Sequence, residues 1–168
     1  MCSRCSIFLL AGLSPLALAA TIEVSVELQA AHPAPFERTV VFVSTDAAGE
    51  VLDTWTVEMA FAEGVAHTVL AGASSAMDSL SAKTDFHLRT RIPCLPVNGE
   101  AEALFTGAAQ LRGGDLNGDN VVDMRDFNRL RYHWFTEDDR ADLTGNGATG
   151  QTDLDVLKSN WLQEGDAP

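Results

Sequence analysis

The sequence predicts two structural regions: an N-terminal antiparallel β-sandwich over residues 20–111 and a small all-α domain over residues 112–165. Two observations support this prediction. Apolar and polar residues alternate along much of the first region, which is typical of half-buried strands. The second region holds two copies of an Asp- and Gly-rich loop, each followed by a short amphipathic helical pattern, with corresponding residues 27 positions apart.

Residues 1–19 have the pattern of a signal peptide. Arg4 supplies a positive charge, residues 7–18 form an apolar run, and Ala17, Leu18 and Ala19 fit the small-x-small cleavage pattern. The apolar run is too short to span a bilayer comfortably, so a retained membrane anchor is the less favoured alternative. We therefore expect a secreted protein, extracellular or at the cell surface, with no membrane span in the mature chain.

Six or seven short strands are predicted in the first region. They fall within residues 21–28, 38–46, 51–61, 63–72, 79–92 (one or two strands) and 100–108. Gly, Pro, Asp and Ser separate these runs, and no long helical pattern interrupts them. This arrangement favours a sandwich that is immunoglobulin- or fibronectin-like in outline, with a small barrel as the alternative.

The predicted sandwich carries no recognisable catalytic motif. It has no G-x-S-x-G sequence, no phosphate-binding loop and no evident pair of catalytic carboxylates. We interpret His32, His67 and His87 as surface or hydrogen-bonded residues, and Trp55 as a core residue in preference to a sugar-stacking platform. Cys94, the one cysteine beyond residue 19, fits a small buried hydrophobe better than an intermolecular bridge. The chain is therefore predicted not to be an enzyme.

The charge balance narrows the possible partners. The chain has 24 acidic and 11 basic residues, for a formal net charge of −13. Such acidity argues against nucleic acid or an anionic membrane as the partner. Part of the negative charge belongs to the two C-terminal loops, where a bound cation would offset it.

The first loop places oxygen-bearing side chains at positions 1, 3, 5, 9 and 12 of a twelve-residue segment. A hard cation such as calcium takes six to eight oxygens at about 2.3–2.6 Å, and a backbone carbonyl at position 7 supplies a further one. An ordinary surface turn is also rich in Asp, Asn and Gly, but it does not require this register. The predicted calcium ligands are Asp115, Asn117, Asp119, the carbonyl of Val121, Asp123 and Asp126.

The second loop repeats this register with fewer charges. Gly150 offers no side chain at position 9, so water would have to fill that place. Because loop 1 carries four carboxylates and loop 2 carries two, we expect the first site to bind calcium more tightly. The predicted ligands of the second site are Asp142, Thr144, Asn146, the carbonyl of Ala148 and Asp153.

A short amphipathic helix is predicted after each loop. Too few residues separate the two units for a further full helix, so each unit is a loop followed by one helix. We expect the two apolar stripes to face each other and to bury both tryptophans, with Leu116 and Leu143 beneath them. The stripes are Phe127, Leu130 and Trp134 in the first unit and Leu154, Leu157 and Trp161 in the second.

These features resemble the type I dockerin domain over residues 113–163. The resemblance implies two EF-hand-type calcium loop–helix repeats related by an internal two-fold, and docking onto a cohesin-type protein domain. Loop 2 departs from the family pattern at Thr144 and Gly150. Matched by position, the residues that would contact the partner are Met124, Arg125, Arg131 and Tyr132 in the first repeat, and Gln151, Thr152, Lys158 and Ser159 in the second. The two sets differ strongly, which disfavours a symmetric, dual-mode docking surface.

The functional expectation combines both regions. The resemblance implies a non-catalytic secreted protein whose dockerin-like tail docks it onto a cohesin-type extracellular assembly linked to polysaccharide breakdown. Polysaccharide is then the candidate ligand of the β-sandwich. The alternative is a secreted, calcium-stabilised binding or surface protein that has no cohesin partner.

Overall fold

The computed structural model describes residues 19–137 and 139–168. The predicted signal peptide lies, apart from Ala19, outside these residues. The described elements are β1 (Ala20–Glu27), β2 (Phe36–Thr45), β3 (Val51–Phe61), β4 (Val65–Ala73), β5 (Ser79–Lys83), β6 (Thr90–Pro93), β7 (Glu100–Phe105), a 3₁₀ turn η1 (Gly107–Ala109), α1 (Met124–Tyr132), a second 3₁₀ turn η2 (Asp139–Ala141) and α2 (Gln151–Ser159).

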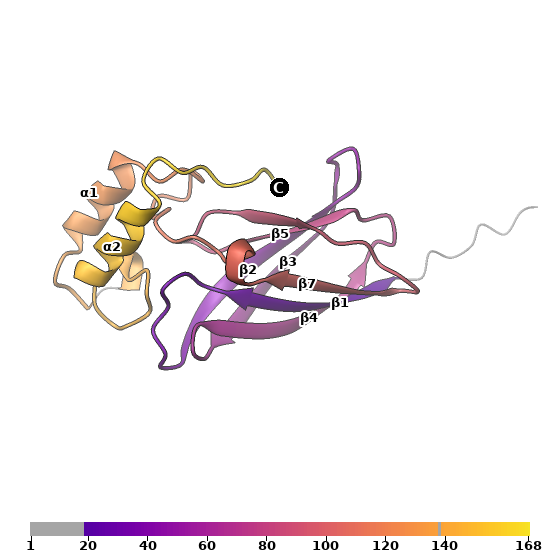
Figure 1. Cartoon of the computed structure of the whole chain (residues 1–168), viewed down its shortest axis with the longest axis horizontal. Coiled ribbons are helices and arrows are strands. Elements are labelled where there is room, and N and C mark those ends of the chain that lie inside the picture. The colour runs from indigo at the N-terminus through magenta and orange to yellow at the C-terminus, as the bar shows by residue number, and fades with distance from the viewer. Residues whose placement is uncertain (1–18, 138) are drawn as a thin grey trace, which may run out of the picture.

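The strands form two facing sheets, as predicted (Figure 1). One sheet has the order β4-β1-β7 and the other the order β3-β2-β5-β6, so the structure is a sandwich and not a barrel. The β1–β7 pair is parallel, with Thr21 opposite Glu100 and Val26 opposite Phe105, so the expectation of a wholly antiparallel fold is wrong for this pair. No hairpin joins the first strand to the last, and nothing therefore forces them to run in opposite directions.

The core of the sandwich follows the predicted alternation. Ile22, Val24 and Val26 of β1 are buried, while their neighbours are exposed or half-buried. Cys94 is also buried, and burial raises the pKa of its thiol. Trp55 is partly buried against the core and donates from its indole nitrogen to the carbonyl of Ala71 at 3.2 Å. Full burial of an aliphatic or aromatic side chain contributes about 1.5–3 kcal/mol, so this cluster dominates the stability of the sandwich.

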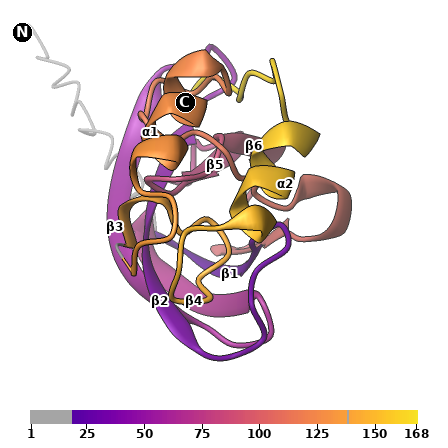
Figure 2. The same cartoon turned by 90° about the vertical axis from the view of Figure 1, so that its left-hand side faces the viewer.

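The two α-helices lie together at one end of the sandwich (Figures 1 and 2). They share a second apolar cluster, to which the sandwich contributes Leu88, with Phe86 packed at its edge. Both residues belong to the connection between β5 and β6. The members from the C-terminal region are Leu116, Val122, Leu130, Ala141, Leu143, Val156 and Leu157. The helices therefore pack around residues from both parts of the chain.

Polar contacts tie the C-terminal region to the sandwich. The side-chain amide of Asn160 donates to Oε1 of Gln29 at 2.6 Å. The backbone N–H of His32 donates to the carbonyl of Thr144 at 2.7 Å. These bonds lie at several points along the junction, and they fix the orientation of the C-terminal region on the sandwich.

One close approach at the junction requires glycine. Gly145 has a φ of +73° and lies against the ring of Phe36, the first residue of β2. A Cβ at this position would lie 2.8 Å from the ring atoms, which is closer than side chains tolerate. Loop 2 thus packs directly on the edge of the sandwich.

The prediction for the two tryptophans is only partly correct. Trp134 is half-buried against the second cluster, but Trp161 is 38% exposed and lies outside it. Both tryptophans lie two residues beyond the last residue of their helix, α1 ending at Tyr132 and α2 at Ser159, so the end of the helix does not account for the difference. Val156 and Asn160 are buried instead. Leu116 and Leu143 are buried in the cluster, as expected.

None of the helices in the described ranges is long and apolar enough to cross a membrane.

Candidate metal centre

Loop 1 is folded around two buried carboxylates, the first of which is Asp115. Its Oδ1 accepts from the backbone N–H of Gly118 at 2.8 Å, and its Oδ2 accepts from that of Asn120 at 3.0 Å. Asn120 has a φ of +69°, in the left-handed region that asparagine tolerates better than most residues. The loop therefore turns sharply around the carboxylate at position 1.

The second buried carboxylate is that of Asp126, at position 12. Its Oδ1 accepts from the backbone N–H of Asn117 at 2.9 Å, and its Oδ2 accepts from that of Asp123 at 2.8 Å. Asp123 in turn caps α1, because its side chain accepts from the N–H of Arg125 at 2.7 Å. Burial raises the pKa of Asp126, and the nearby carboxylate of Asp115 raises it further.

The remaining ligand candidates of loop 1 lie at its outer rim. Asp119 is exposed, and its Oδ1 accepts from the N–H of Val121 at 3.1 Å. Its Oδ2 accepts from the side-chain amide of Asn117 at 2.9 Å and from Arg125 at 3.2 Å. The rim is therefore held by local hydrogen bonds between residues that the sequence predicted as ligands.

Loop 2 repeats the framework of loop 1. Asp142 is buried and accepts from the N–H groups of Gly145 and Gly147, each at 2.8 Å. These donors lie 27 residues after Gly118 and Asn120, the donors to Asp115. The internal repeat predicted from the sequence is therefore present in the hydrogen bonds themselves.

Asp153 takes the place of Asp126 in loop 2. It is fully buried, and its Oδ1 accepts from the N–H of Thr144 at 3.0 Å and from the Thr144 hydroxyl at 3.1 Å. Its Oδ2 accepts from the N–H of Gly150 at 2.8 Å. The Thr144 hydroxyl is buried at the third loop position, where loop 1 has an amide.

Short backbone pairs join the two repeats. Val122, at position 8 of loop 1, accepts from the N–H of Leu162 at 2.9 Å and donates to the carbonyl of Gln163 at 2.9 Å. The equivalent Thr149 pairs with residues 135–136, again with two bonds of 3.0 Å. The partner of Val122 is thus the segment that follows the other helix. Each loop is thereby held by the end of the opposite repeat.

The charge balance of the loops fits a bound cation. Lys83 is ion-paired with Asp115, and Arg125 with Asp119 and Asp123. Among the residues that the structure describes, no basic side chain lies within 4.0 Å of the carboxylates of Asp126, Asp142 or Asp153. A buried carboxylate without a cation is costly. Because every candidate donor is an oxygen, a hard cation such as calcium suits these loops.

Carboxylates alone do not complete either site. No group of three His, Cys, Asp or Glu side chains in a metal-holding arrangement occurs in the described ranges. The uncharged candidates would therefore have to supply part of the shell. They are Asn117 and the carbonyl of Val121 in loop 1, and Thr144, Asn146 and the carbonyl of Ala148 in loop 2.

Two basic residues of the sandwich contact the loops and were missed by sequence reasoning. Lys83, the last residue of β5, contacts Asp115 and donates to the carbonyl of His87 at 3.1 Å. Arg38 of β2 donates to the backbone carbonyl of Asp142. Neither residue belongs to a motif, and each lies at least 32 positions from its loop partner, so no local signal identifies them.

His87 is hydrogen-bonded, which is one of the two alternatives predicted for it, and it does not lie at the surface. It is completely buried, and although its Nδ1 pairs with the hydroxyl of Thr84 at 2.8 Å, its Nε2 has no partner among the described residues. Burial lowers its pKa to about 3, and the charges of Arg38 and Lys83 contribute. Gly113 packs beside His87, but the close approach there is to Val156, whose Cγ1 would lie 2.7 Å from a Cβ at Gly113.

The eight residues matched to partner contacts are all exposed, but their surroundings differ. In the first repeat, Met124 is 56% and Tyr132 is 83% exposed. In the second repeat, Thr152 and Ser159 line a groove against residues 29–33 of the sandwich. The side-chain amide of Gln29 donates to the Ser159 hydroxyl at 3.3 Å. The surface of α1 is therefore the more open one.

Comparison with known families identifies this C-terminal region. Residues 113–162 match the family model of the dockerin type I domain. The match spans both loops and both helices, and it confirms the resemblance seen in the sequence. No curated protein matches the chain.

Proposed function

We propose that this chain is a non-catalytic protein that docks onto a cohesin-type domain. The premise is that residues 113–162 are a dockerin type I domain. A dockerin type I domain binds calcium and implies a cohesin partner in a cellulosome-type assembly. Proteins that contain such domains are typically extracellular. The docking would place the β-sandwich on that assembly, with polysaccharide as its candidate ligand.

The observation that carries the proposal is the repeated pair of buried aspartates. Each loop has one aspartate at position 1 and one at position 12, and the two accept equivalent backbone N–H groups. A loop that buries two carboxylates this way is costly unless a cation neutralises them. Bound calcium would supply that neutralising charge.

We assign two calcium sites of unequal strength to these loops. The first uses Asp115, Asn117, Asp119, Asp123, Asp126 and the carbonyl of Val121; the second uses Asp142, Thr144, Asn146, Asp153 and the carbonyl of Ala148. The smaller number of carboxylates in loop 2 makes it the weaker site. In both loops the position-12 aspartate also organises the start of its helix, so calcium binding and the docking surface depend on the same residue.

Docking through the first repeat is better supported than docking through the second. Met124, Arg125, Arg131 and Tyr132 are exposed on α1, whereas Ser159 of α2 contacts Gln29 of the sandwich. A partner that approached α2 would have to accommodate residues 29–33 beside it. We therefore assign the partner contact to α1.

A second candidate function is a calcium-stabilised binding protein with no cohesin partner. The close junction between the sandwich and the C-terminal region favours this alternative, because a tail that only docks has no need of buried contacts with its own neighbour. In that case the calcium loops would serve to close one end of the sandwich.

Binding of the full chain to a panel of purified type I cohesin domains tests the proposal. We expect at least one domain to bind in calcium and to be released by a chelator. Asp126→Ala should lose this binding, while Glu50→Gln, an exposed change at the far end of β2, should keep it. A folded chain that takes up calcium and binds no cohesin domain would favour the second candidate.

A further inference from the structure

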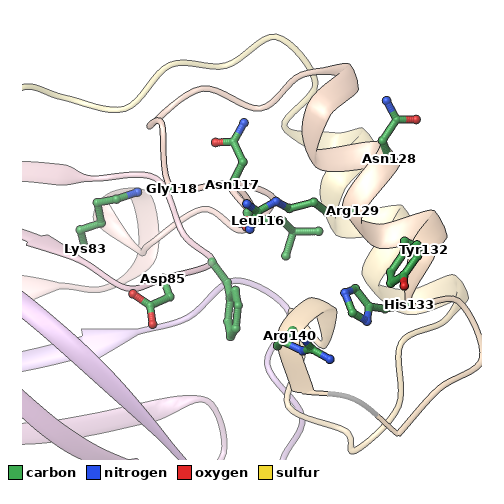
Figure 3. Close-up of a pocket in the computed structure, with 11 residues that line it drawn as sticks. Lys83, Asp85, Leu116, Asn117, Gly118, Asn128, Arg129, Tyr132, His133 and Arg140 are labelled. Carbon is green, nitrogen blue, oxygen red and sulfur yellow. The ribbon is translucent and has the colours of Figure 1, made fainter.

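A cleft lies between α1 and the connection from β5 to β6. It has a volume of about 790 Å³. Figure 3 shows Arg129 extending from α1 toward Leu116, with His133 and Arg140 near the other end of the helix. Lys83 and Phe86 of the sandwich line the opposite wall. Both parts of the chain therefore form this cleft.

The cleft is basic in a chain whose net charge is −13. Arg129 and Arg140 line it against the carboxylate of Asp85, and Lys83, which also lines it, is ion-paired with Asp115. Arg129 is exposed, and one of its nitrogens donates to the backbone carbonyl of Leu116 at 2.9 Å. A guanidinium has five N–H donors, so this bond orients Arg129 and leaves donors for a ligand.

The cleft continues the exposed surface of α1. Tyr132 lines the cleft and is also one of the residues matched to partner contacts. Its ring is 83% exposed, and Phe86 supplies a second aromatic side chain across the cleft. An acidic side chain that enters here would have aromatic walls on either side and an arginine at its end.

We propose that the docking surface of α1 extends into this cleft, and that an acidic side chain of the cohesin-type partner binds Arg129 there. This inference rests on the proposed function. It makes the sandwich part of the recognition surface, since Lys83 and Phe86 complete the cleft. An acidic partner protein is favoured over an acidic sugar because the cleft is continuous with the docking residues through Tyr132.

The first test measures affinity for the cohesin domain that binds the wild-type chain most tightly, using the full chain in calcium. Arg129→Gln removes the cation and should weaken binding about tenfold. Asp85→Asn removes the opposing carboxylate and should strengthen binding about threefold, a gain that misfolding cannot produce. Glu50→Gln makes the same charge change far from the cleft and should leave affinity unchanged. Unaltered affinity in both cleft variants would overturn the inference.

The second test needs no cohesin domain. The ¹⁵N-labelled full chain is titrated with acetyl-Glu-Glu-Glu-amide, and with acetyl-Gln-Gln-Gln-amide as the neutral control. We expect amide signals of residues 85–86 and 129–133 to shift with the glutamate peptide alone, and to shift at lower concentration in Asp85→Asn. Equal shifts with both peptides, or none in the cleft, would overturn the inference. Shifts caused by oligogalacturonate but not by the glutamate peptide would also overturn it, in favour of an acidic sugar.

The two tests separate this inference from the proposed function. If no cohesin domain binds the wild-type chain, the proposed function fails, and the peptide titration still decides whether the cleft binds an acidic group. If a cohesin domain binds but neither cleft variant changes its affinity, docking stands and the cleft is not part of it.

Discussion

The two repeats share one hydrogen-bond framework but have different surroundings. In each loop, aspartates at positions 1 and 12 accept backbone N–H groups from equivalent positions. Loop 1 then adds two further carboxylates and an ion pair with Lys83, whereas loop 2 adds the neutral Thr144 and packs on Phe36. The two aspartates thus account for the hydrogen-bond framework that both loops share. The residues at the other positions differ between the loops, so they can set the calcium affinity of each loop and its contacts with the sandwich.

The largest expected effect tests the apolar cluster that the two repeats share. Leu130 and Leu157 occupy equivalent positions and are both fully buried. Leu130→Ala and Leu157→Ala should each lower the free energy of unfolding by about 2–5 kcal/mol, because each leaves a cavity in the second cluster. Chemical denaturation of the full chain in calcium measures this. A loss below about 1 kcal/mol in one variant alone would mean that the two repeats do not share a core.

The next effect is a loss of folding stability at acid pH, which arises from the buried His87. The pKa of His87 is lowered to about 3 in the folded chain, from an ordinary value near 6.5. The unfolded chain therefore binds a proton below about pH 6.5 while the folded chain does not, so His87 contributes stability above that pH and loses it progressively as pH falls toward 3. We expect a loss of about 2–3 kcal/mol between pH 7 and pH 4.5 from this residue.

Denaturation curves at the two pH values measure this loss. His87→Gln should reduce the difference between them, whereas His67→Gln, an exposed change, should leave it as in the wild-type chain. If both variants keep the full pH dependence, the loop carboxylates and not His87 are responsible.

A smaller effect concerns Lys83, which pairs with the carboxylate of Asp115, whereas Arg38 bonds to the backbone carbonyl of Asp142. The ammonium of Lys83 contacts Asp115 and so competes with a calcium ion for that carboxylate. Lys83→Met should raise calcium affinity at site 1 about five- to tenfold and leave site 2 unchanged. Lys158→Met, on the exposed side of α2, serves as the matched control. Equal changes at both sites in calorimetric titrations would contradict a local competition.

A further effect distinguishes the two tryptophans. Trp134 is half-buried and Trp161 is partly exposed beyond the end of α2. Trp134→Ala should cost about 1–3 kcal/mol of unfolding free energy and Trp161→Ala less than about 1 kcal/mol. Thermal denaturation in calcium compares them. A loss of unfolding free energy for Trp161→Ala as large as that for Trp134→Ala would instead support the symmetric arrangement that the sequence pattern suggested.

Much of the fold could be predicted because its signals are local. Alternation along residues 21–28 predicts β1, and the alternating oxygens of residues 115–126 place Asp115 and Asp126 at the ends of one loop. Their burial and shared amide bonds agree with that register. The loops could therefore be recognised from the spacing of their oxygen-bearing residues alone.

The remaining features depend on contacts between distant parts of the chain. The parallel pairing of β1 with β7, the ion pair of Lys83 with Asp115 and the burial of Leu88 among the helices each join segments that no sequence pattern relates. Trp161 was misplaced although its spacing from the helix matches that of Trp134, since each tryptophan lies two residues beyond its helix and only Trp134 packs on the cluster.

Calorimetric titration of the full chain with calcium tests the inequality of the two repeats most directly. We predict two phases, a tight one from loop 1 and a weak one from loop 2 with a Kd of about 10⁻⁴ M or above. Asp126→Ala should abolish the tight phase, and Asp153→Ala should remove only the weak one. A single phase of two equal sites would contradict this account, because it would mean that Lys83 and the uncharged oxygens cancel the difference in carboxylates.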